Sequence, residues 1–178
     1  MNNDYLVISA IGEDQVGIIS ELAQTTADAG CHIADSRMTV LGGDFAIIML
    51  AEGRWNELAK LEASLPHLER KLGLTITTRR TNGGSELQTR LLPYSVEVVG
   101  MDEPGIVQEL TDFVAGREIN VREMATTRSK AAYTGTPLFC VQLTLDIPAD
   151  TSIARLREEF MEFCDHLNLD ANLEPLKS

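Results

Sequence analysis

Two short segments place an acidic residue three positions before a glycine, at Asp14 to Gly17 and at Asp102 to Gly105. An isoleucine follows each glycine and opens a stretch with the apolar spacing of a helix. Backbone N–H groups at a helix start are unpaired and attract an anion such as a carboxylate. An adjacent aspartate could hold an ammonium group, so the two together would suit a free amino acid. The same residues also suit a plain helix cap, in which the aspartate accepts a backbone N–H bond and no ligand takes part.

Other residues near these segments could complete such a site. The glycines would let a ligand or another backbone segment approach closely, because they carry no side chain. His32 and Asn120 occupy matching positions near the start of the next expected strand, within reach of the turn. An asparagine amide offers both a donor and an acceptor.

The elements that must position these residues occur twice. The segment from Ile11 to Leu22 aligns with the segment from Val99 to Leu110 at a constant offset of 88 positions, and glycine, aspartate, isoleucine, glutamate and leucine recur at equivalent places. The offset continues to the segment around His32 and Asn120, and then grows to 94 because the second copy has about six extra residues in a loop-like stretch, 129–137. The chain is a duplication.

Each copy has the pattern strand, helix, strand, strand, helix, strand. Apolar alternation predicts the strands and helical spacing predicts the helices. The expected strands are Tyr5–Ile11, 32–40, Phe45–Leu50 and Leu74–Arg79 in the first copy, and Tyr94–Val99, 120–128, Leu138–Leu145 and Leu167–Leu173 in the second. This βαββαβ order predicts an α+β protein of two ferredoxin-like units, each an antiparallel sheet with both helices on one face. We expect the units at 1–80 and 92–178, with a linker rich in glycine and polar residues at 81–91.

The segment from Asp102 to Ile106, Asp-Glu-Pro-Gly-Ile, followed by a helix and then by Ile119-Asn-Val121, resembles the signature of ACT domains. These are small ferredoxin-like modules that bind amino acids and regulate metabolism, with the ligand usually held at an interface between paired modules. The resemblance implies that the ligand contacts Asp102, Gly105, Ile106, Asn120 and Val121. In the first copy the matching residues are Asp14, Gly17, Ile18, His32 and Ile33; that copy departs from the pattern, with valine for proline and histidine for asparagine.

Two such modules, joined by a short linker, resemble the tandem ACT repressors that control glycine catabolism. That resemblance implies a small amino-acid ligand, with glycine suspected, and a protein partner such as a DNA-binding transcriptional activator. A homo-oligomer is possible. Two other interpretations stay open: an amino-acid sensor that regulates a metabolic enzyme, and an interaction module without a ligand.

Charge and hydropathy exclude several classes of protein. The 178-residue chain has 15 lysines and arginines against 27 acidic residues, a net charge of −12. A protein that grips phosphates normally has a clustered basic face, so direct nucleic-acid binding is disfavoured. No apolar run approaches the roughly 20 residues of a membrane span, and the N-terminus lacks the basic start of a signal peptide. We expect a cytoplasmic protein with no membrane contact.

Catalytic and metal-binding motifs are absent from the sequence. The three histidines are far apart, and no nucleophile elbow, zinc-protease helix or phosphate-binding loop occurs. The three cysteines, Cys31, Cys140 and Cys164, have no metal-type spacing and are expected in the core as free thiols. We therefore expect no enzyme activity, no metal and no cofactor.

Overall fold

The computed structural model describes residues 4–83 and 91–176, which form two compact units, one from each range. Residues 84–90, most of the expected linker, lie outside the described residues. At its two ends, Thr81 is the last residue of a strand and Leu91 the first residue of another. In the described part of the chain, no helix is long and apolar enough to cross a membrane.

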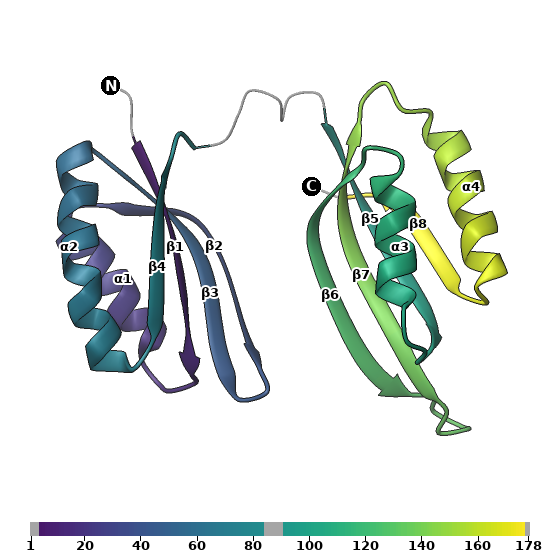
Figure 1. Cartoon of the computed structure of the whole chain (residues 1–178), viewed down its shortest axis with the longest axis horizontal. Helices are drawn as coiled ribbons and strands as arrows, with labels where there is room; N and C mark the ends of the chain where they lie inside the picture. The colour runs from purple at the N-terminus through teal and green to yellow at the C-terminus, as the bar shows by residue number, and fades with distance from the viewer. Residues whose placement is uncertain (1–3, 84–90, 177–178) are drawn as a thin grey trace. The chain divides into compact units, whose positions relative to one another are not determined.

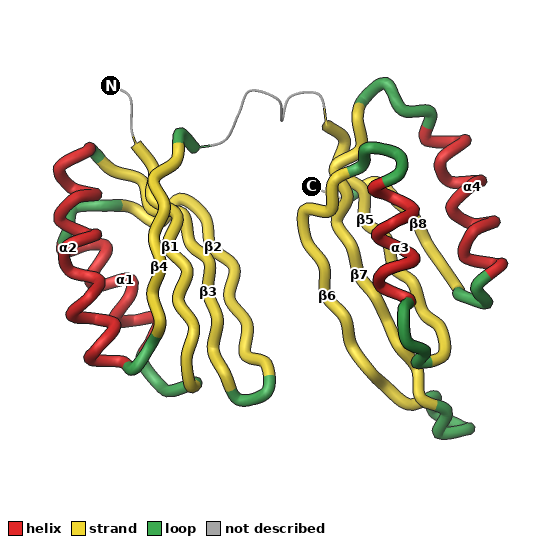
Figure 2. Tube along the Cα trace, in the orientation of Figure 1, coloured by secondary structure: helices red, strands yellow, loops and turns green. Residues whose placement is uncertain are grey.

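Both units have the predicted βαββαβ order. The first contains β1 (Asp4–Glu13), α1 (Ile18–Asp28), β2 (His32–Leu41), β3 (Asp44–Gly53), α2 (Trp55–Leu72) and β4 (Thr75–Thr81). The second contains β5 (Leu91–Met101), α3 (Ile106–Ala115), β6 (Asn120–Lys130), β7 (Pro137–Pro148), α4 (Ile153–His166) and β8 (Asp170–Pro175). The sheets have the equivalent orders β2-β3-β1-β4 and β6-β7-β5-β8, and the strand pairs are antiparallel. In each unit both helices cover the same face of the sheet (Figures 1 and 2), so the predicted fold class is confirmed.

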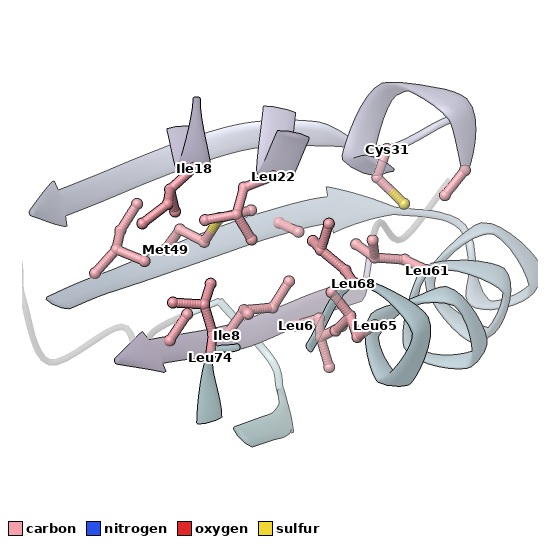
Figure 3. Close-up of a cluster of buried hydrophobic side chains, with 14 of the residues drawn as sticks. Leu6, Ile8, Ile18, Leu22, Cys31, Met49, Leu61, Leu65, Leu68 and Leu74 are labelled. Carbon is pink, nitrogen blue, oxygen red and sulfur yellow. The ribbon is translucent and has the colours of Figure 1, made fainter. Parts of the chain in front are cut away.

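Alternation along the strands and the stripe along each helix build one core per unit. In the first unit, β1 turns Leu6 and Ile8 towards the helices, where they meet leucines of α2 and the buried face of α1 (Figure 3). In the second unit, Val96 and Val98 of β5 are buried in the core in the same way. A cluster of three phenylalanine rings joins the two helices, with Phe113 centred 5.4 Å from Phe160 and 4.7 Å from Phe163.

The recurring glycine at the end of the first strand has a packing role in both units. A Cβ at Gly100 would lie 2.3 Å from Cδ2 of Leu169, and one at Gly12 would lie 2.9 Å from Cδ2 of Leu74. Both leucines are buried just before the last strand. The glycine therefore lets the incoming strand pack tightly against the first one.

The end of the second unit differs from the prediction. The last strand begins at Asp170, not at Leu167, because α4 continues to His166 and a turn follows, in which Asn168 adopts a φ of 54°. The turn closes with a hydrogen bond of 2.9 Å from the Leu169 N–H to the Cys164 carbonyl.

The three cysteines are free thiols, but only two lie in the core. Cys31 and Cys164 are buried, whereas Cys140 lies on the sheet face away from the helices, with its Sγ 3.8 Å from Oε1 of Glu97. The core position expected for Cys140 is therefore wrong. Its neighbours in β7, Phe139 and Val141, point towards the helices instead, as strand alternation requires.

The buried thiol of Cys164 makes the free energy of unfolding depend on pH in the alkaline range. Burial, with a smaller contribution from the charge of Asp165, raises the pKa of this thiol from 9.0 to about 11. Because the unfolded thiol ionises first, its stabilising contribution is complete below pH 9 and is lost as the pH rises from 9 to 11. We expect the free energy of unfolding to fall by about 2–3 kcal/mol from this group over that range. Urea titrations at several pH values would measure the fall, and a Cys164→Ala variant should show a shallower one. An equally steep fall in the variant would contradict the assignment.

Candidate functional site

The two Asp-x-x-Gly segments form the turn between the first strand and the first helix of each unit. Both turns are fixed to the neighbouring hairpin by the backbone of the aspartate. The Asp14 N–H donates to the Gly43 carbonyl at 3.0 Å, and the Asp102 N–H donates to the Pro137 carbonyl at 3.3 Å. Each turn is therefore held between the start of a helix and the end of the hairpin that follows that helix.

The glycines are the N-cap residues of these helices. Gly17 has a φ of 98° and Gly105 a φ of 96°, in the left-handed region that side chains disfavour. A Cβ at either position would meet no atom within 4 Å. No other segment of the described chain therefore approaches these glycines closely, and backbone conformation is what requires glycine. The close approach of a ligand stays a prediction.

The capping role expected for the aspartates is wrong. No side chain caps α1 or α3, because each helix starts four residues after the aspartate and the N-cap itself has no side chain. The first N–H groups of these helices therefore remain available to a ligand. Ile18 and Ile106, which follow the N-caps, fix the helix starts by packing on the cores.

A substitution at Gly105 tests the conformational explanation. Gly105→Ala should destabilise the second unit by about 1–2 kcal/mol, because a left-handed backbone costs a non-glycine residue about that much. Gly105→Asn should cost less, since asparagine tolerates this region better. Thermal unfolding of both variants would measure the difference. Equal losses for the two, or none, would contradict this account.

The turn of the second unit borders two cavities. One, of about 450 Å³, is lined by Asp102, Glu103, Pro104, Gly105, Ile106, Val107, Gln108, Arg128 and Phe139. The other, of about 170 Å³, lies between the turn and the segment after α4, where Leu167, Asn168 and Leu169 line it. The Glu103–Ile106 segment lines both cavities, whereas Asp102 lines only the larger one.

Arg128, near the end of β6, brings a positive charge to the larger cavity. Its Nε lies 3.1 Å from Oδ2 of Asp102; the arginine side chain is 77% exposed and the aspartate 24%. The site thus combines a carboxylate, a guanidinium and the N–H groups at the start of α3. The guanidinium and the N–H groups can bind a carboxylate, and the second oxygen of Asp102 can bind an ammonium group.

Sequence reasoning missed Arg128, although the repeat contained a signal for it. The offset of 88 positions matches Arg128 with Val40, and the register agrees, since Arg128 pairs with Phe139 and Val40 with Phe45. The first turn therefore has no arginine at this position. Gln15 of that turn instead donates from Nε2 to the Leu72 carbonyl at 2.6 Å. The two turns share a backbone but differ chemically.

The strand-start candidates lie at the opposite end of each sheet. Asn120 pairs with Asp146, whereas Met101, just before Asp102, pairs with Leu138. Eight residues of β7 separate the two levels, a distance of about 26 Å. His32 pairs with Glu52 and Glu13 with Asp44, which gives the same separation in the first unit. The expectation that His32 and Asn120 reach the turn of their own unit is therefore wrong. Ile33 is exposed beside His32, and Val121 packs partly on the core.

No group of three or more histidine, cysteine, aspartate or glutamate side chains within residues 4–83 and 91–176 could hold a metal ion. His67 and His166 are exposed on α2 and α4. The candidate site is therefore the polar turn at the start of α3.

Comparison with known proteins assigns the family. The ACT domain family matches residues 4–79. The glycine cleavage system transcriptional repressor of Escherichia coli (strain K12) is 30% identical over 171 residues, which cover 95% of this chain and 88% of that protein. The chain belongs to the ACT-domain family.

Solved structures contain the same tandem of ACT units. The crystal structure of an inferred glycine cleavage system transcriptional repressor matches with a TM-score of 0.76 and 27% identity, over the full length of both chains. A protein of unknown identity from Galdieria sulphuraria matches with a TM-score of 0.78 and 27% identity, over 98% of this chain and 99% of that one. The duplication deduced from the sequence is thus a tandem of ACT units.

Proposed function

We propose that this ACT-domain chain is a non-enzymatic regulator that responds to a free amino acid bound at the start of α3. The observation that carries the proposal is the pairing of Asp102 with Arg128 beside the uncapped N-terminus of that helix. The carboxylate of an amino acid can pair with Arg128 and its ammonium group with Asp102, in a cavity that Phe139 also lines.

In the proposed complex, the ligand carboxylate binds the first N–H groups of α3 and the Arg128 guanidinium. The ligand ammonium binds Asp102, which shares its negative charge between the ligand and Arg128. Glycine is the ligand we propose, because the relative that matches most of the chain is named for the glycine cleavage system. Other amino acids carry the same two charges, so only measurement separates them.

A ligand that also contacts the strand start must lie between two modules. Asp102 and Asn120 are about 26 Å apart within one unit, as their partners in β7 require, and one amino acid cannot span that distance. The second unit contains both halves of the ACT signature, Asp102 to Ile106 and Asn120 with Val121. We therefore place the ligand between the second units of two chains related by a two-fold axis, each supplying a turn to one site and an asparagine to the other.

The regulatory output we propose is transcriptional repression through a DNA-binding activator. The E. coli relative is named as a transcriptional repressor, whereas this chain has a net charge of −12. An acidic protein has little affinity for DNA by itself, so it needs a protein that binds DNA in its place.

A thermal-shift screen against the twenty amino acids tests the ligand. A ligand at about 100 times its Kd adds about 2.7 kcal/mol to the stability of the state it binds, a shift of several degrees for a chain of this size. A shift with glycine alone supports the proposal. A shift with a different amino acid keeps the sensor and changes the ligand, and no shift with any of them contradicts the proposal.

A further inference from the structure

The hairpin between β6 and β7 is built differently from its counterpart in the first unit. There, Gly42 and Gly43 alone join β2 to β3, both with positive φ, as in a tight two-residue hairpin turn. In the second unit, six residues, Ala131–Thr136, take their place. Because two residues close the equivalent hairpin, the fold does not require this longer connection, hereafter the tip.

The tip holds an aromatic side chain fully in water. Tyr133 is 102% exposed. The backbone around it is ordered: the Ala131 N–H donates to the Thr136 carbonyl and the Gly135 N–H to the Ala131 carbonyl, both at 2.9 Å, and the Thr134 and Thr136 hydroxyls lie 2.8 Å apart. A tyrosine on an ordered loop loses little conformational freedom on binding, and tyrosine is enriched among the residues that dominate protein interfaces.

The tip directly follows two cations of an acidic chain. Arg128 and Lys130 precede it on the same side of β6, and the sequence has no acidic residue from Met124 to Leu145. Arg128 pairs with Asp102, whereas Lys130, among the residues that the structure describes, has no ion pair. A partner that contacts Tyr133 is therefore favoured when its own surface is acidic.

The tip is also continuous with the amino-acid site. Pro137, directly after it, accepts the hydrogen bond of 3.3 Å from the Asp102 N–H, and Arg128, directly before Ser129 and Lys130, pairs with the same residue. A ligand that binds Asp102 and Arg128 therefore contacts one residue of β6, Arg128, and one residue that is hydrogen-bonded to the start of β7, Asp102. These are the two strands that the tip connects.

We propose that the tip is the docking element for the protein partner, with Tyr133 as the anchor and Lys130 facing an acidic surface of that partner. The inference rests on the proposed function, since the partner is its DNA-binding activator. Contact with DNA is disfavoured because two cations, one of them engaged by Asp102, neutralise too few phosphates for stable binding.

Repression in cells tests the docking element. The readouts are a reporter under a promoter of the glycine cleavage system and, with the purified protein, the melting temperature and its shift with glycine. Tyr133→Ala should reduce repression about tenfold or more, while the melting temperature and the glycine shift stay unchanged. Lys130→Glu should have a similar effect and Lys130→Arg almost none. Leu41→Ala, which trims an exposed residue beside the two-glycine turn of the first unit, is the matched control and should repress like the parent.

Four results would overturn the inference, each in a different way. Full repression by Tyr133→Ala would show that the tip is not the anchor, with the proposed function intact; failure of the parent chain to repress would remove the proposed function itself. Binding of the purified parent to promoter DNA, weakened by Lys130→Glu, would make the occupant a nucleic acid. A dimer seen by sedimentation in the parent and lost in Tyr133→Ala would make it a second copy of the chain.

Discussion

Replacing Arg128 with valine should remove most of the stabilisation that glycine gives to the protein. Valine is the residue at the equivalent position of the first unit, Val40, so this backbone position accepts it. The variant loses a charge-assisted hydrogen bond to the ligand carboxylate, which is worth about 1.5–3 kcal/mol and corresponds to a Kd about ten to a hundred times higher. At a glycine concentration of about 100 times the parent's Kd, the stabilisation should fall from about 2.7 kcal/mol to about half of that or less.

Calorimetric titration and thermal shift with glycine would both report this loss. The variant without ligand should melt like the parent, because an ion pair as exposed as that of Arg128 contributes little to stability. Arg128→Lys should recover part of the affinity through its charge. Arg155→Val is the matched control, since Arg155 is 80% exposed and pairs with Glu159 at 2.8 Å on α4. Glycine affinity of Arg128→Val equal to that of the parent would exclude Arg128 from the site.

The fold could be predicted because the repeat and the alternation of apolar residues each lead to it. The offset between the copies identifies the unit. Strand alternation places Val96 and Val98 on one face of the expected strand Tyr94–Val99, and the structure shows that this face is buried. The residue that caps each helix was harder to predict than the fold. Aspartate is a common helix cap, but the choice of Gly105 as N-cap depends on a backbone φ that residue type alone does not determine.

Closeness in the sequence wrongly predicted that Asn120 lies near Asp102. The order of the strands and helices would have predicted the correct arrangement. A helix that follows a strand runs back along the sheet, so the residue after α3 must lie near the start of β5 and far from Asp102. Asn120 follows that helix directly, and its pairing with Asp146 places it at that end. The same reasoning predicts that Arg128 lies near Asp102. β6 runs back along the sheet, so that its end lies beside the end of β5. The order of strand, helix and strand thus predicts which residues can meet, while their separation in the sequence does not.

Mixing two inactive variants should restore glycine binding. If the ligand lies between the second units of two chains, Asp102→Ala and Asn120→Ala each damage both sites of their own dimer, through residues that are about 26 Å apart within one unit. Each variant alone should lose most of the glycine shift. In a dimer with one chain of each kind, one site has both substitutions and the other has neither. After unfolding and refolding of an equimolar mixture, about a quarter of the parent's sites should be intact.

Calorimetric titration of the mixture would count these sites, because the recovered sites should bind with the parent's Kd and only their number should fall. A mixture of Asp102→Ala with Gly105→Ala is the matched control, since both substitutions affect the same turn and no intact site can form from them. Absence of recovery, with both single variants inactive and folded, would exclude a site shared between two second units. Full glycine binding by Asn120→Ala alone would confine the ligand to the turn, where Asp102, Arg128 and the first N–H groups of α3 would have to suffice.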